Sequence, residues 1–183
     1  MRSFFRYYFF FITFLFSQTF LEVGMPAPEW KFPDADGNLF TMDDWAGKIM
    51  GLSYVDPDES EMNEEFSDRI KKAIDIDSLI SRDSFKGIGI ADCASSWKPD
   101  FLIKAIGGRK AKKYETTVLF DSDAILRKSW NLYEDSYNII ILDKGRIVRG
   151  LYKEKMTELE MDEALQLIIN LQKKSPFISL TMS

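Results

Sequence analysis

Strand-length apolar runs alternate with helix-patterned stretches through the middle of this 183-residue chain. Ile49–Val55, Phe85–Asp92 and Thr116–Asp121 are rich in aliphatic and β-branched residues, as is typical of strands. Runs that are apolar almost throughout indicate strands buried on both faces of a sheet. Because parallel neighbours need a crossover connection, this alternation predicts an α/β fold with helices on both faces of one sheet.

Helical spacing marks the stretches that follow these strands. Apolar residues recur on one face of a first predicted helix, at Met62, Phe66, Ile70, Ala73 and Ile74. A second helix is expected to open at Pro99 and to run through Ile106, where Gly107 and Gly108 should stop it. The stretch Asp123–Trp130 is expected to form a third helix.

Two hairpins are predicted to add antiparallel strands at the ends of the domain. The first joins Glu29–Phe32 to Leu39–Met42, and the second joins Asn138–Asp143 to Arg146–Tyr152 through Lys144-Gly145. Thr157 and Glu160 have the spacing of a capping box, which opens a last helix to about Lys174. The expected architecture is a three-layer sandwich with a mixed sheet and an N-terminal β-hairpin extension, in one domain over residues 20–175 with a tail at 176–183.

The first residues are typical of a secretory signal peptide, which we assign to residues 1–19. Arg2 and Arg6 flank the start of the apolar run Tyr7–Phe16, and a polar stretch follows it. A run of about ten apolar residues is short for a membrane span, which needs about twenty. We therefore expect a periplasmic protein without a stable membrane span. The alternative is a protein anchored by an uncleaved N-terminal segment, because the small residues Ser17 and Thr19 are not the preferred alanines.

Composition excludes several kinds of chemistry. The chain has no histidine and a single cysteine, Cys93, so a disulfide within the chain, a C-x-x-C motif and the usual histidine-dependent sites cannot form. We expect no cofactor and no metal. Loss of residues 1–19 would remove two of the 24 basic residues and leave 22 against 29 acids, a net charge of −7. This acidity argues against nucleic acid as a partner, and we interpret the basic run Arg109–Lys113 as a solvated loop rather than an anion-binding patch.

Several short strings resemble known families. Val23–Pro28, Asp34–Gly37 and Gly47–Ile49 look like the opening of the peroxiredoxin and thiol-disulfide branch of the thioredoxin-like superfamily. Later strings are more similar to the bacterial periplasmic YtfJ family, and these are Tyr114–Thr117, Asp121–Asp123, Trp130–Leu132 and Ile141–Gly145. The resemblance covers residues 22–172 and implies a thioredoxin-like fold in the periplasm. It implies no activity, since YtfJ-like proteins have none established.

The chain departs from the redox-active members of that superfamily at the residues that matter most. Those members carry a nucleophilic cysteine in the loop after the strand matching Ile49–Val55, whereas this loop reads Asp-Pro-Asp-Glu-Ser-Glu over residues 56–61. The proline that faces such a site should precede the strand Asn138–Asp143, and Tyr137 stands there. We therefore predict a binding edge without dithiol chemistry, formed by Asp56, Asp58, Glu59, Ser60 and Tyr137.

Two functions follow from these residues. The first is a non-catalytic binding or accessory protein of the cell envelope with a protein or peptide partner, whose groove would be lined by Trp97, Tyr114, Trp130, Tyr133 and Tyr137. The second is a one-cysteine redox protein, in which a helix beginning at Pro99 would lower the pKa of Cys93. A structural interpretation stands beside each: Cys93 as a half-buried apolar residue, and the acids of residues 56–61 as helix caps rather than calcium ligands.

Overall fold

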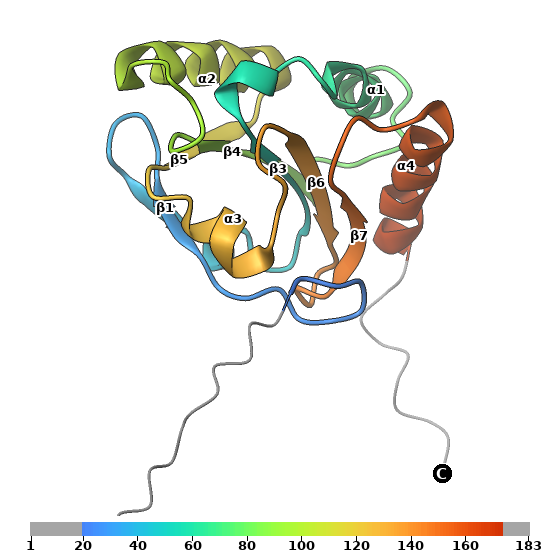
Figure 1. Ribbon diagram of the computed structural model, residues 1–183. Helices are drawn as coiled ribbons and strands as arrows, with labels where there is room; N and C mark the ends of the chain where they lie inside the picture. Colours follow the sequence, from blue (N-terminus) through green and yellow to red (C-terminus); the bar gives the residue numbers. More distant parts are fainter. Residues whose placement is uncertain (1–19, 174–183) are drawn as a thin grey trace, which may run out of the picture.

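A five-stranded mixed sheet lies at the centre of the protein, seen in a computed structural model that describes residues 20–173 (Figure 1). Strands β3 (Ile49–Val55), β4 (Phe85–Asp92) and β5 (Thr117–Asp121) are parallel. Strands β6 (Tyr137–Leu142) and β7 (Val148–Tyr152) continue the sheet antiparallel, in the order β5-β4-β3-β6-β7. The predicted α/β class is confirmed. The predicted signal peptide and the tail at 176–183 lie outside the described residues.

Helices cover both faces of this sheet. The helices α1 (Glu64–Asp75), α2 (Asp100–Tyr114) and α4 (Glu158–Lys173) lie on one side in Figure 1. Helix α3 (Ile125–Trp130) lies on the other side with the small hairpin of β1 (Lys31–Pro33) and β2 (Leu39–Thr41). Two short 3-10 turns complete the elements, at Met42–Trp45 and Pro57–Glu59. No helix within residues 20–173 is long and apolar enough to cross a membrane.

Side-chain alternation along the central strand builds two separate cores. Met50, Leu52 and Tyr54 of β3 pack in one core with Trp30 and with Trp130 of α3. Residues with odd numbers on the same strand face α1 and α4 instead, and Ile49 joins the core there. Strand β6 is buried along its whole length, as expected for a strand with neighbours on both sides and a layer on each face.

Helix α2 corrects one prediction. It does not stop at Gly107 and Gly108 but continues to Tyr114, and it ends where Glu115 adopts a left-handed conformation with φ of 50°. The physical reason is packing, because a Cβ atom on Gly107 would lie only 3.0 Å from a Val118 methyl group and 3.1 Å from the Phe120 ring. The missing side chain lets the helix lie close to β5. The basic run at residues 109–113 is therefore part of a helix and not a loop.

Two other contacts position the rest of the chain. The Asn63 side chain, which is buried, donates to the carbonyl oxygens of Tyr137 and Glu154 and accepts from the Met156 amide, and so ties the start of α1 to β6 and to the approach to α4. Backbone hydrogen bonds join Gly24 and Met25 to Val148, and Pro26 bridges to Ile147. The N-terminal segment thus runs along the start of β7.

The predicted capping box of Thr157 and Glu160 is present.

Candidate functional site at the carboxyl edge of the sheet

Asp56 follows β3 directly and is only 4% exposed. Its amide donates to the Ser136 carbonyl oxygen over 2.9 Å, which joins this loop to the segment before β6. Its carboxylate accepts from the Asp58 amide at 2.7 Å and so caps the turn Pro57–Glu59. Burial raises the pKa of Asp56 because the charged form loses its hydration, whereas Ser95 and Lys98 act in the opposite direction.

A second carboxyl group faces Asp56 from the other side of the edge. Asp135, in the segment before β6, raises the pKa of Asp56 further through its negative charge. Its backbone is left-handed, with φ of 48°. Sequence reasoning placed Tyr137 at this edge but did not single out Asp135, because no sequence spacing relates it to Asp56.

The acidic loop is tied to the loop that follows β4. Asp58 forms an ion pair with Lys98 and accepts a hydrogen bond from the Ser96 hydroxyl group at 2.9 Å. Trp97, between those two residues, is 83% exposed, and the Lys98 ammonium group lies 5.6 Å from its ring centroid. Glu59 and Ser60 are partly exposed beside them. No group of three or more acidic or cysteine side chains that could hold a metal ion is found within residues 20–173.

The predicted aromatic groove does not form as a single surface. Trp130, the last residue of α3, is fully buried, and Tyr137 is 8% exposed with its hydroxyl 3.4 Å from that of Ser67 on α1. The Tyr114 hydroxyl group donates to the carboxylates of Glu64 and Asp68 on α1. Trp97 and Tyr133 are the members of the predicted set that are largely exposed. Tyr137 is the register partner of Val55, so its backbone lies beside the edge. Its side chain instead faces the helix layer that contains α1.

Cys93 lies just beyond β4, with its amide bonded to the Asp121 carbonyl oxygen. It is half-buried, and its sulfur lies 3.6 Å from the Ala91 carbonyl oxygen. Burial raises the pKa of the thiol to about 12, and the charges of Asp100, Asp92 and Asp121 add to this effect. The sequence hypothesis required the start of α2 to lower this pKa. Instead, Asp100 in the first turn of α2 contributes to raising it.

A buried polar network that sequence reasoning missed lies on the α3 side of the same edge. Asp121 accepts from the Tyr54 hydroxyl at 3.1 Å and from the amides of Ile125 and Leu126 at the start of α3. Asp92 lies 2.7 Å from the Arg127 guanidinium group. Burial raises the pKa of Tyr54 and of Asp92. The network fixes α3 over the sheet. Its only sequence signal is an aspartate at the end of each of two strands.

Comparison with known proteins defines the class of fold. No protein-family model matches the chain, and no curated protein sequence matches it significantly. Solved structures do match. One is described as a DsbE-type thiol:disulfide interchange protein from Chlorobium tepidum (TM-score 0.56, 14% identity, 83% of this chain and 99% of that one).

Two further structures agree with it. One is the thioredoxin domain of a thiol-disulfide oxidoreductase from Bacteroides vulgatus (TM-score 0.59, 16% identity, 82% and 99% covered). The other is an exposed lipoprotein thioredoxin from Streptococcus pneumoniae (TM-score 0.55, 15% identity, 76% and 98% covered). The fold of this protein is therefore thioredoxin-like, as predicted.

Proposed function

We propose that this protein is a YtfJ-like, thioredoxin-fold binding protein of the cell envelope, which holds a partner polypeptide at the carboxyl edge of its sheet and carries out no dithiol exchange. The observation that carries the proposal is the buried Asp56 in the loop after β3. In redox-active thioredoxin-like proteins this loop presents a nucleophilic cysteine. A carboxylate forms no mixed disulfide, so this edge retains the shape of such a site without its chemistry.

The cysteine that remains supports the same conclusion. Thiol exchange proceeds through the thiolate. Burial and three neighbouring carboxylates hold the pKa of Cys93 at about 12, so the thiolate is scarce near neutral pH. The one-cysteine alternative would need a partner whose binding lowered this pKa.

The surface beside Asp56 suits a polypeptide partner. Trp97 is 83% exposed and Phe101, at the start of α2, is 74% exposed. Tyr133 is 48% exposed on the segment that precedes β6. Tryptophan and tyrosine are enriched at protein interfaces and among the residues that contribute most to binding. The proposed location in the envelope rests on the leader-like sequence of residues 1–19.

Site-specific photo-crosslinking tests this surface in cells that make the full chain. A benzophenone amino acid replaces Trp97, and in a matched control it replaces Leu159, which is 67% exposed on α4. We expect a defined adduct from position 97 and none from position 159. Equal labelling from both positions, or none from position 97, would contradict the proposal.

A second measurement separates the binding function from the redox alternative. The full chain is added to a mixture of insulin and dithiothreitol, and the rate of insulin precipitation is followed. We expect no acceleration. Acceleration that disappears in Cys93→Ser would establish the one-cysteine redox function instead.

A further inference from the structure

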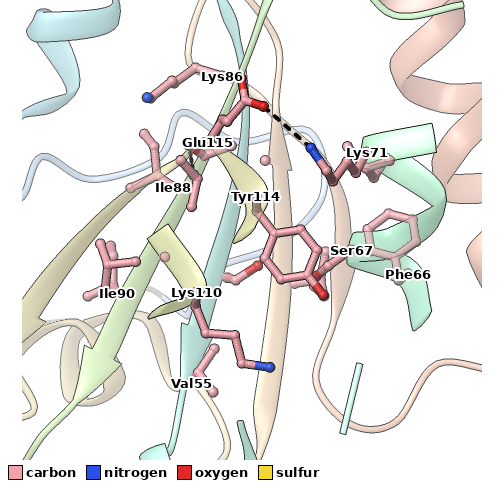
Figure 2. A pocket seen from close by; sticks show the side chains of 18 of the residues that line it. Val55, Phe66, Ser67, Lys71, Lys86, Ile88, Ile90, Lys110, Tyr114 and Glu115 are labelled. Atoms are coloured by element: carbon pink, nitrogen blue, oxygen red, sulfur yellow. Dashed lines mark hydrogen bonds and ion pairs between the residues drawn. The ribbon is translucent and has the colours of Figure 1, made fainter. Parts of the chain in front are cut away.

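A cavity of about 340 Å³ lies between the sheet and the helices α1 and α2, on the face opposite α3 (Figure 2). Its volume falls within the range of sites for small molecules, roughly 300–1,000 Å³. It is separate from the network around Asp121 because it lies on the other face of the sheet. The proposed partner-binding function does not use it.

Small residues on neighbouring strands form the floor of this cavity. Gly51 of β3 is the register partner of Gly87 of β4, and Ser53 is the partner of Gly89. The Phe85 ring fills the space over Gly51, where a Cβ atom would lie 2.9 Å from it. Over Gly87 the nearest atom to such a Cβ is the Thr116 hydroxyl at 3.4 Å. The floor near Gly87 and Ser53 therefore has room that side chains do not fill.

The walls are apolar and the roof is closed by polar contacts. Aliphatic and aromatic side chains of both helices line the walls, including Phe66, Ile70, Ile74, Ile103 and Ile106. Above them, Glu64 of α1 accepts from Lys110 and Lys113 of α2 at 3.0 and 2.6 Å, and from the Tyr114 hydroxyl at 3.1 Å. Figure 2 shows Tyr114 and Lys110 of α2 on the side facing Ser67 and Phe66 of α1. Separation of these partly exposed contacts would admit a ligand between the helices.

The end of the cavity near the strand starts carries excess positive charge. Lys71 and Arg82 each pair with both Asp75 and Glu115. Lys48, just before β3, donates to the Arg82 carbonyl oxygen at 2.9 Å, and no carboxylate pairs with it in the part of the chain that the structure describes. Lys71 and Arg82 are thus matched by two carboxylates at this end, and the positive charge of Lys48 is left over.

The excess of positive charge also acts on the neighbouring Lys86, whose side chain lies on the other face of the sheet. Its ammonium group lies 5.8 Å from the Trp45 ring centroid. Burial lowers the pKa of Lys86, and the positive charges of Lys48 and Arg82 lower it further. This end of the cavity is thus complementary to an anion.

We propose that this cavity binds a single-chain amphiphile, a long-chain carboxylate, with its tail over Gly87 and Ser53 and its carboxylate at Lys48 and Arg82. A peptide would bring backbone amides into apolar walls that offer them few hydrogen-bond partners, at a large cost in free energy. An acyl tail has no such groups. Its burial is favourable along its whole length, and the excess positive charge fixes which end carries the anion.

The test uses the delipidated full chain and cis-parinaric acid, a fluorescent long-chain carboxylate, as the probe. Dodecanoate, dodecylamine and methyl dodecanoate compete with it below their micelle concentrations. We expect dodecanoate to displace the probe at the lowest concentration. Equal displacement by the amine and the ester would overturn the assignment of the anionic end.

Variants locate the site within the molecule. Lys48→Glu should weaken probe binding about fivefold, the effect of roughly 1 kcal/mol expected for a partly exposed ion pair. Lys31→Glu, an exposed position on β1, makes the same change of charge on the other side of the sheet and should leave binding unchanged. Equal effects of the two variants would overturn the proposal.

Filling the cavity gives an independent measurement. Ser53→Leu places an aliphatic side chain on the floor and should abolish probe binding while cooperative thermal unfolding is retained. If Ser53→Leu fails to fold, Gly87→Ala, whose Cβ has space, should still reduce binding. Unchanged binding in a folded cavity-filled variant, or binding to the apolar run Tyr7–Phe16 alone, would show that the probe binds elsewhere and would refute the site.

Discussion

Asp56 and Cys93 lie beyond the ends of neighbouring strands, and burial acts on both in the same direction. Each group is held towards its protonated form because the protein interior solvates charge poorly. The consequences differ. The Asp56 carboxyl group still accepts the hydrogen bond from the Asp58 amide, whereas a protonated thiol loses its nucleophilicity. Burial thus leaves Asp56 able to serve as a structural hydrogen-bond acceptor and makes Cys93 unreactive.

Alkylation of Cys93 measured against pH tests this conclusion. In the folded full chain we expect slow modification whose rate rises with pH and does not level off near 9.0, the ordinary thiol value, since the pKa is held at about 12. In urea the rate should rise and level off near the ordinary value, which serves as the control. A plateau at a lower pH in the folded protein would contradict the structure and favour redox chemistry.

Sequence reasoning located Asp56 and Asp58 correctly beside β3, because an apolar run of strand length fixes where its loop begins. It could not place Asp135 opposite Asp56 or turn the side chain of Tyr137 towards Ser67. Those relations depend on the register between β3 and β6. A register shift of one residue between β3 and β6 would turn Tyr137 to the other face of the sheet. The structure shows that β6 includes Tyr137.

Among the elements, the strands were predictable and the length of α2 was not. Apolar runs and turn residues are local signals, so β3, β4 and the final hairpin follow from them. A glycine pair within a helix is locally unfavourable by roughly 1 kcal/mol per residue, and on that ground we predicted a helix end. Contact between Gly107 and β5 overrides the local preference, and such a contact has no signature within the helix itself.

Alanine substitutions in α2 distinguish the two glycines. A Cβ on Gly107 meets Val118 and Phe120, so overpacking, which costs about 1–3 kcal/mol, should exceed the gain in helix propensity and make Gly107→Ala less stable than the parent protein. A Cβ on Gly108 meets nothing within 4 Å, so Gly108→Ala should stabilise it by about 0.5–1 kcal/mol through helix propensity. Urea unfolding measures both values. The same sign for the two variants would show that α2 does not pack on β5 as described.

At the scale of the whole molecule, the ion pairs between α1 and α2 couple the stability of the fold to pH. Hydrogen bonds from Lys113 and Lys110 lower the pKa of Glu64 from 4.5 to about 2. A lowered carboxyl pKa stabilises the folded state above the unfolded value, and this stabilisation disappears as the pH falls through the folded value. Asp56 and Asp92 act in the opposite sense, because their raised pKa values favour folding less as the pH rises above 3.8.

Glu64→Gln should therefore flatten the loss of stability in acid. We expect the free energy of unfolding of the variant to depend less on pH between 4.5 and about 2 than that of the parent protein. Urea titrations across this interval measure it. Glu61→Gln, at an exposed position before α1, is the matched control and should leave the pH dependence unchanged. Parallel curves for the parent and Glu64→Gln would show that Glu64 does not link the helices.

Gly24 and Met25 pair with Val148 at the start of β7, and Ala27 pairs with Arg146 just before it. This pairing affects how copies of the protein meet one another. An outer strand with free amide and carbonyl groups is a template for sheet extension between molecules. Here the N-terminal segment occupies the first part of that edge, and Pro26, which has no amide hydrogen, lies opposite Ile147. The segment of residues 24–27 thus covers the first part of the β7 edge, which would otherwise favour self-association.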